Sequence, residues 1–170
     1  MTASILVAGV GNIFLSDDGF GVEVANRLAA ESFPEDVRVA EFGIRGIHLA
    51  YELLEGYRTA ILVDALSRGD APGTVYVFEP DLDAPAAPLP DGHTMHPRAV
   101  IDYLRSLGGP PVRFLVVGCE PASLDEGIGL SEPVTAAVEP AVGLVHELVE
   151  RELAVLADLS PRPALTGQAL

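Results

Sequence analysis

The sequence predicts an α/β protein in which helices cover both faces of a largely parallel sheet of about five strands. Short apolar runs alternate with segments of helical periodicity, which is typical of βαβ units. The length of 170 residues suits one domain, and 49% hydrophobic residues suffice for a full core. We expect a single domain over residues 1–158 and a tail without function over 159–170.

Each element follows from a local pattern. Strands are predicted at short apolar runs: 4–8, 37–42, 59–63, 74–78 and 112–117. Helices are predicted where apolar residues recur three or four positions apart: about 19–32, 46–55 (which carries Ile47, Ala50, Leu53 and Leu54), a segment opening at Pro97 and a segment following Ser131.

Proline and glycine mark the boundaries. The turn Ala71-Pro72-Gly73 introduces the fourth strand, and Ser131-Glu132-Pro133 is a strong helix start with a capping serine. Pro140 lies inside the last helix and should kink or break it near Glu139. The acidic segment 79–92 contains four prolines and is expected to be a mobile loop.

The charge balance excludes several classes of partner. With 25 acidic and 10 basic residues, the net charge of −15 repels nucleic-acid phosphates and anionic membranes. No apolar run approaches the ~20 residues of a membrane span, and we recognise no signal peptide. We therefore expect a cytoplasmic protein that binds neither nucleic acid nor membrane, and we expect a monomer because no long exposed apolar patch is evident in the sequence.

The single cysteine, Cys119, narrows the chemistry further. One cysteine allows neither an internal disulfide nor a cysteine-based zinc site within one chain. Cys119 follows the apolar run 114–117, so we interpret it as a buried structural thiol rather than a nucleophile.

The turn after the first strand is the most informative segment. The strand ends in Gly9-Val10-Gly11, and two adjacent carboxylates, Asp17 and Asp18, follow where a helix should begin. A dinucleotide-binding fingerprint would need a third glycine at the position of Phe14, and the carboxylates would repel a pyrophosphate. The glycines allow a tight turn, and the aspartates either cap the helix or form a site at the sheet edge.

Two further junctions add chemistry. Asp64 ends the buried strand 59–63, where a charge is costly unless it is paired or coordinated. His93 and His96 follow the acidic loop, and Pro97 holds His96 extended at a helix start. Two carboxylates and one histidine from three βα junctions suit nickel or zinc, although each residue alone fits a capping or surface role. A Ser-His-Asp hydrolase fits less well, because the chain has no Gly-x-Ser-x-Gly elbow.

The segment Val7-Ala8-Gly9-Val10-Gly11-Asn12-Ile13-Phe14-Leu15-Ser16-Asp17-Asp18-Gly19-Phe20-Gly21 resembles the opening signature of the [NiFe]-hydrogenase maturation proteases. Further stretches agree in the same order: Leu62-Val63-Asp64-Ala65, Ala71-Pro72-Gly73-Thr74, Gly118-Cys119-Glu120-Pro121, Gly127-Ile128-Gly129-Leu130-Ser131 and Val138-Glu139-Pro140-Ala141. The resemblance covers about residues 4–150. It implies a three-layer α/β/α sandwich around a twisted sheet. It also implies a cytoplasmic endopeptidase that removes the C-terminal extension of a hydrogenase large-subunit precursor after nickel insertion.

The resemblance also implies site residues. The family's metal-contacting positions fall on Asp18, Asp64 and His96, and not on His93. Relatives often have glutamate where this chain has Asp18, and the shorter side chain should pull a bound metal toward the sheet or loosen its grip. The family's usual Gly-Thr-x-Gly turn is replaced here by 43–46, Gly-Ile-Arg-Gly, in which Arg45 either meets the precursor or lies at the surface.

These observations lead to one main hypothesis and two alternatives. In the main hypothesis, Asp18, Asp64 and His96 dock onto nickel held by the precursor, and other divalent metals could occupy the site in vitro. The metal positions the scissile peptide, and it either polarises the peptide carbonyl or activates a water molecule. Alternatively, the carboxylate of Asp18 or Asp17 acts as general base. The alternatives are a nickel-binding accessory protein that cleaves nothing and a hydrolase resembling peptidyl-tRNA hydrolase.

Overall fold

Five strands form one sheet in the computed structural model, which describes residues 3–83 and 96–159. The strand order is β2-β1-β3-β5-β4. The strands are β1 (Ile5–Val10), β2 (Val37–Gly43), β3 (Thr59–Ala65), β4 (Val75–Phe78) and β5 (Arg113–Cys119). All pairings are parallel except that of edge strand β4, which runs antiparallel to β5. The mostly parallel sheet predicted from the sequence is therefore confirmed.

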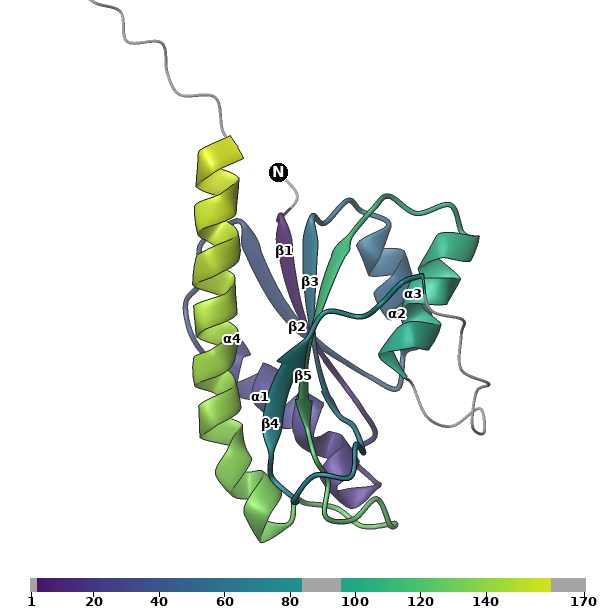
Figure 1. Cartoon of the computed structure of the whole chain (residues 1–170), viewed down its shortest axis with the longest axis vertical. Helices are drawn as coiled ribbons and strands as arrows, with labels where there is room; N and C mark the ends of the chain where they lie inside the picture. Colours follow the sequence, from purple (N-terminus) through teal and green to yellow (C-terminus); the bar gives the residue numbers. More distant parts are fainter. Residues whose placement is uncertain (1–2, 84–95, 160–170) are drawn as a thin grey trace, which may run out of the picture.

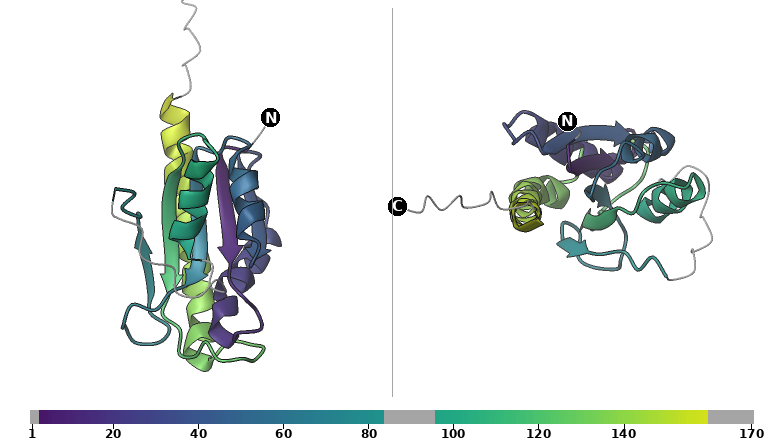
Figure 2. Two further views of the ribbon diagram at one scale, coloured as in Figure 1. Left: turned by 90° about the vertical axis from the view of Figure 1, so that its right-hand side faces the viewer. Right: turned by 90° about the horizontal axis from the view of Figure 1, so that it is seen from above.

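Helices cover both faces of the sheet (Figures 1 and 2). They are the short 3-10 helix η1 (Ser16–Gly19) and the helices α1 (Phe20–Ala29), α2 (Gly46–Leu53), α3 (Pro97–Ser106) and α4 (Glu132–Leu159). Buried residues of α1 and α4 share one hydrophobic cluster with the sheet, and those of α2 and α3 share the other. The fold is thus a three-layer α/β/α sandwich, as the family resemblance implied.

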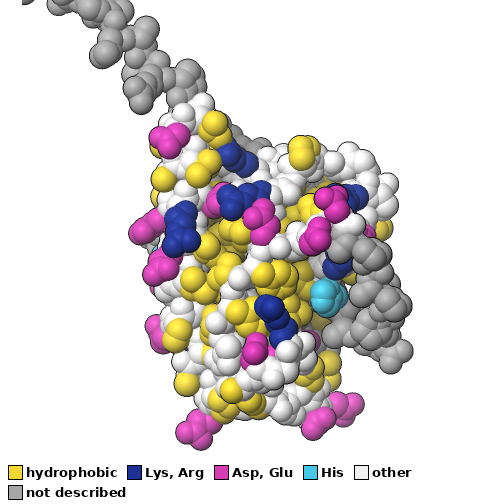
Figure 3. Space-filling model, in the orientation of Figure 1, with side chains coloured by type: hydrophobic (Ala, Val, Ile, Leu, Met, Phe, Trp, Pro, Cys, Tyr) yellow, Lys and Arg dark blue, Asp and Glu magenta, His cyan; other side chains and the backbone are white. Residues whose placement is uncertain are grey.

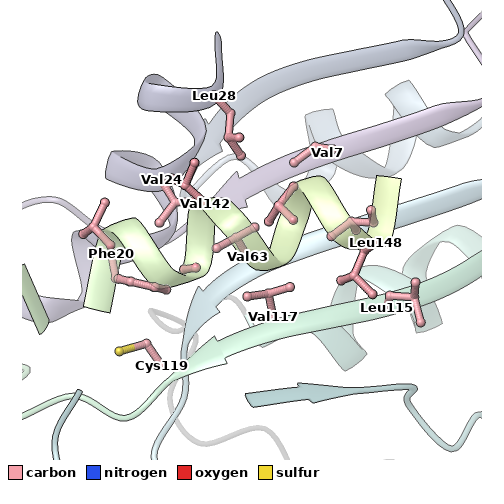
Figure 4. Packing of buried hydrophobic residues seen from close by; sticks show 14 of the residues in the cluster. Val7, Phe20, Val24, Leu28, Val63, Leu115, Val117, Cys119, Val142 and Leu148 are labelled. Atoms are coloured by element: carbon pink, nitrogen blue, oxygen red, sulfur yellow. The ribbon is translucent and has the colours of Figure 1, made fainter. Parts of the chain in front are cut away.

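The two cores explain why the central strands are continuously apolar. In β1, Ile5 and Val7 face the layer of α1 and α4, whereas Leu6 and Ala8 face the layer of α2 and α3. A parallel strand that is buried on both sides has no polar face. Figure 4 shows the first of these cores, in which side chains of α1 and α4 meet those of β1, β3 and β5.

Several details differ from the prediction. Strands β3 and β5 continue to Ala65 and Cys119, so that Asp64 lies inside a strand. Helix α4 passes through Pro140 without a break, but Figure 1 shows its first turns inclined to the rest of the helix, so of the predicted kink or break only the kink is seen. Pro140 and Ala136 are both exposed, so the carbonyl that loses its helical hydrogen bond faces water.

The topology places the loops that carry the predicted site residues at one edge of the sheet. Strands β1, β3 and β5 are parallel, so the junctions that follow them lie at the same edge. Figure 1 shows that α3 begins at the end of the molecule toward which these strands point. Residues 84–95 and 160–170, which include His93, most of the predicted loop and the tail after Leu159, lie outside the described residues. Among the described residues, no helix combines the length and apolarity that crossing a membrane requires.

Candidate active site

Glycines bring the turn after β1 into contact with the strand ends. Gly11 has a φ of +132°, and a Cβ there would lie 1.9 Å from the Asp18 carbonyl oxygen. A Cβ on Gly21 would lie 2.1 Å from the Val63 carbonyl oxygen, so α1 can approach β3 only without a side chain. The close approach places η1, with its two aspartates, directly over the carboxyl ends of β1 and β3.

Asp18 is buried beside this turn, with 8% of its surface exposed. The backbone N–H of Asn12 donates to its Oδ2 at 2.8 Å. In the described chain, η1 and α1 begin without a side-chain capping hydrogen bond, so Asp18 does not cap either helix. Burial raises the pKa of Asp18, and the bond from Asn12 only partly opposes that effect.

Asp64 forms the second half of an acidic pair. It is 2% exposed near the end of β3, and its Oδ1 lies 3.7 Å from the position that a Cβ on Gly11 would take. Burial raises the pKa of Asp64 well above its ordinary value, and the charge of Asp18 raises it further. The two carboxyls therefore disfavour simultaneous ionisation, and a bound cation would relieve this cost.

Asp17 has a different role from its neighbour. It is fully buried, and its Oδ1 accepts the N–H of Ser131 at 2.7 Å. Its Oδ2 accepts the N–H groups of Ala122 and Ser123 at 2.8 and 3.1 Å and the Ser131 hydroxyl at 2.9 Å. Burial alone would raise the pKa of Asp17, but these four bonds together lower it. A weakly basic, fully bonded carboxylate is a structural anchor rather than a general base.

The sequence interpretation missed the loop that Asp17 anchors. Residues 120–131, between β5 and α4, lie against the turn after β1. The N–H of Ser16 donates to the Gly127 carbonyl at 2.8 Å, and the N–H of Gly127 donates to the Phe14 carbonyl at 2.9 Å. The predicted capping serine, Ser131, donates its hydroxyl to Asp17 instead. The motifs at 118–121 and 127–131 contributed to the family resemblance, but they did not indicate that this loop donates hydrogen bonds to Asp17.

His96 caps the start of α3. Its backbone is extended, with φ −81° and ψ 137°, and its Nδ1 accepts the N–H of Arg98 at 3.2 Å. Partial desolvation lowers the pKa of His96, so the ring is neutral at pH 7 and able to bind a metal. In residues 3–83 and 96–159, no three His, Cys, Asp or Glu side chains lie close enough to hold a metal ion. Asp18 lies near enough to Asp64 for its charge to raise the Asp64 pKa. A metal site that also includes His96 stays a prediction.

Cys119 lies behind the site and not in it. Its side chain is fully buried in the core shared with α1 and α4 (Figure 4). Burial, with smaller contributions from the charges of Asp17 and Glu120, raises the pKa of this thiol to about 11. The prediction of a structural thiol agrees with this burial, because the thiolate needed for nucleophilic attack is suppressed.

Comparison with known proteins points to one family. The family model described as hydrogenase maturation protease matches residues 22–148. Similar relatives include the hydrogenase expression/formation protein HoxM of Azotobacter vinelandii, 33% identical over 99% of this chain and 86% of that protein. The hydrogenase 2 maturation protease of Escherichia coli is 33% identical over 81% of this chain and 85% of that protein.

Solved structures agree with this assignment. The hydrogenase maturating endopeptidase HybD from E. coli superposes with a TM-score of 0.76 and 31% identity, over 89% of this chain and 94% of that chain. HybD from Thermococcus kodakarensis superposes with a TM-score of 0.65 and 26% identity, over 87% of this chain and 99% of that chain.

Proposed function

Because the chain belongs to the hydrogenase maturation protease family, we propose that it removes the C-terminal extension of a nickel-loaded [NiFe]-hydrogenase large-subunit precursor. The family supports proteolytic processing of a hydrogenase. The nickel dependence, the cleavage at the C-terminus and the residues involved are our proposal. We place the reaction in the cytoplasm and assign it to a monomer.

The observation that carries the proposal is the buried acid pair of Asp18 and Asp64 at the carboxyl edge of the sheet. A buried pair of carboxyls with raised pKa values retains at least one proton or takes up a cation. Nickel carried by the precursor is such a cation, and carboxylate and imidazole ligands suit it. His96, at the start of α3, is the proposed third ligand.

Nickel is the recognition element in this proposal. When Asp18 and Asp64 bind the precursor's nickel, they exchange a proton for the metal ion, so docking is coupled to proton release. The docked nickel fixes the precursor, and the scissile peptide then lies beside the acid pair in a defined orientation. The raised pKa values of Asp18 and Asp64 belong to the free protein, in which the pair holds the proton that nickel displaces, whereas the pKa of Asp17 is lowered and Asp17 has no such proton to give up.

Docking has a consequence for His96. Its Nδ1 accepts a hydrogen bond from Arg98, so the neutral ring carries its proton on Nε2. Binding of nickel through Nδ1 replaces that capping bond directly. Binding through Nε2 requires the proton to move to Nδ1, where it opposes the N–H of Arg98. Either mode therefore loosens the first turn of α3 when the precursor binds.

The test is processing of a co-expressed large subunit, followed by mass spectrometry. We expect loss of a C-terminal peptide only when nickel and this protein are both present. Asp64→Asn and His96→Ala should abolish processing, whereas Asp158→Asn and His146→Ala, on α4, serve as matched controls. Wild-type processing by both site variants would refute the proposal. Tight nickel binding by calorimetry without any cleavage would instead indicate the accessory nickel-binding role.

A further inference from the structure

A hollow between α2 and α3 has no role in the proposed chemistry. This α2–α3 groove has a volume of about 460 Å³. Its walls include Ile44, Ile47 and His48 around the start of α2, and Ala99, Val100 and Tyr103 on α3. The volume lies within the ~300–1,000 Å³ of clefts that bind small ligands, and it accepts a few side chains rather than a domain surface.

The groove displays apolar surface that the fold itself does not need. Ile44 and Ile47 are each 59% exposed, although the sequence placed Ile47 among the apolar residues of its helix. Leu49, Ala50 and Leu53 supply the face of α2 that packs on the sheet. Two isoleucines beside a hollow are more than scattered surface residues, since grouped apolar surface marks a binding site.

The groove and His96 share helix α3, although His96 itself does not line the groove. His96 is followed on the same face of α3 by Ala99, Val100 and Tyr103, at spacings of three, four and seven residues. Helix α2 begins directly after β2, so its first turn also lies at the carboxyl edge of the sheet. A chain bound beside His96 can therefore continue along α3 without turning away from the protein surface.

The charge of the groove differs from that of the rest of the protein. Among the described residues, its lining contains Arg45 and His48 but no Asp or Glu, in a chain of net charge −15. Acidic side chains are spread over the face of the protein shown in Figure 3. Arg45 donates to the Phe42 and Glu41 carbonyls at 3.1 Å each and lies 3.6 Å from the Glu41 carboxylate, so its guanidinium is held near the groove and its charge is partly balanced from outside the lining. The lining thus favours an apolar segment, and Arg45 favours a carbonyl or carboxylate acceptor near one end.

We propose that the α2–α3 groove binds apolar side chains of the precursor's C-terminal extension. The inference rests on the proposed function and adds a determinant of substrate preference. A short, detachable segment suits a groove of this size, whereas the folded body of the precursor is positioned by its nickel. Nickel docking and groove binding then act at two points on one chain and align the bond between them.

The test compares the Ile44→Ser/Ile47→Ser variant with Leu159→Ser, which changes an equally exposed apolar residue at the far end of α4. Cleavage of nickel-loaded precursor is followed over a range of precursor concentrations. We expect the groove variant to raise KM about tenfold with kcat unchanged, which corresponds to the loss of about one buried apolar side chain. Leu159→Ser should match the wild type, and thermal unfolding should show that both variants are folded.

A second arm identifies the occupant. Serine replacements of the apolar residues in the extension should raise KM to the same degree, and combining them with the groove variant should add little further. Additive effects of the two sets of substitutions, or an unchanged KM in the groove variant, would overturn the inference about the groove. The proposed function would still hold in that case, provided that the wild type cleaves the precursor. A change of oligomeric state in the groove variant would assign the groove to a second copy of the chain and also overturn it. Absence of cleavage by the wild type would refute the proposed function itself.

Discussion

Replacement of Asp17 by asparagine tests the anchoring role assigned to this residue. The amide oxygen can take the place of Oδ2 and keep three donors, those of Ala122, Ser123 and the Ser131 hydroxyl. The amide NH₂ then faces the N–H of Ser131, at the position where Oδ1 accepted a bond of 2.7 Å. The opposite orientation is worse, because three donors would face the NH₂ group.

The expected loss of stability follows from these contacts. Hydrogen bonds to a charged group contribute about 1.5–3 kcal/mol and neutral ones about 0.5–1.5 kcal/mol, so three bonds lose about 1 kcal/mol each. The opposed donors add about 1–3 kcal/mol. After relaxation we expect a loss of about 4 kcal/mol, which is large but leaves a typical domain of 5–15 kcal/mol folded.

The assay is urea unfolding followed by circular dichroism, with Asp158→Asn as the control on an exposed carboxylate. The folded pKa of Asp17 lies below the ordinary value of 3.8. Its stabilising contribution is therefore complete above pH 3.8 and is lost as the pH falls through the lower folded pKa. The difference between wild type and Asp17→Asn should be constant at neutral pH and shrink in acid. A loss below about 1 kcal/mol, or a difference that grows in acid, would refute the reasoning.

Three further changes have defined outcomes. Asp64→Asn should raise the melting temperature at pH 7, although processing is lost. The folded pKa of Asp64 is raised, so the wild type loses stability as the pH rises above the ordinary value of 3.8, and the asparagine variant avoids this loss. An unchanged or lower melting temperature would contradict this reasoning. His96→Ala should lower stability by about 1 kcal/mol through loss of the α3 cap, measured by urea unfolding; no loss would mean that the cap contributes nothing. Gly21→Ala should cost at least about 2 kcal/mol in the same assay, since its Cβ would lie 2.1 Å from the Val63 carbonyl oxygen. Gly143→Ala, with nothing within 4 Å, should be neutral or stabilising, and equal effects of the two glycine changes would contradict the packing argument.

The sequence was sufficient to predict the layers and to single out Asp64 because both depend on local patterns, whereas Asp18 was chosen over Asp17 by the family resemblance. Central strands buried on both faces read as continuous apolar runs, and Asp64 interrupts one of them near its end. Asp18 follows the glycine turn, so its place at the sheet edge is nearly fixed by chain connectivity. The resemblance to the maturation proteases then led to the prediction that these positions contact a metal.

Long-range contacts were not predictable in the same way. Nothing near Asp17 in the sequence distinguishes it from Asp18, because its hydrogen-bond partners lie 105 to 114 residues away. The direction of β4 depends on a turn and not on its apolar pattern. Ile47 matched the helical apolar pattern, but its exposure is set by the gap between α2 and α3, which no local pattern contains.

The separation between Asp17 and its partners has a consequence for biosynthesis. The ribosome releases the N-terminal turn early, but the loop that donates hydrogen bonds to Asp17 is complete only when Ser131, the residue before α4, has been translated. Until then Asp17 is hydrated and η1 lacks its anchor, so the nascent chain cannot hold the acid pair in its final geometry. The acid pair therefore reaches its final geometry only after the last strand and the residues that lead into the last helix have been translated.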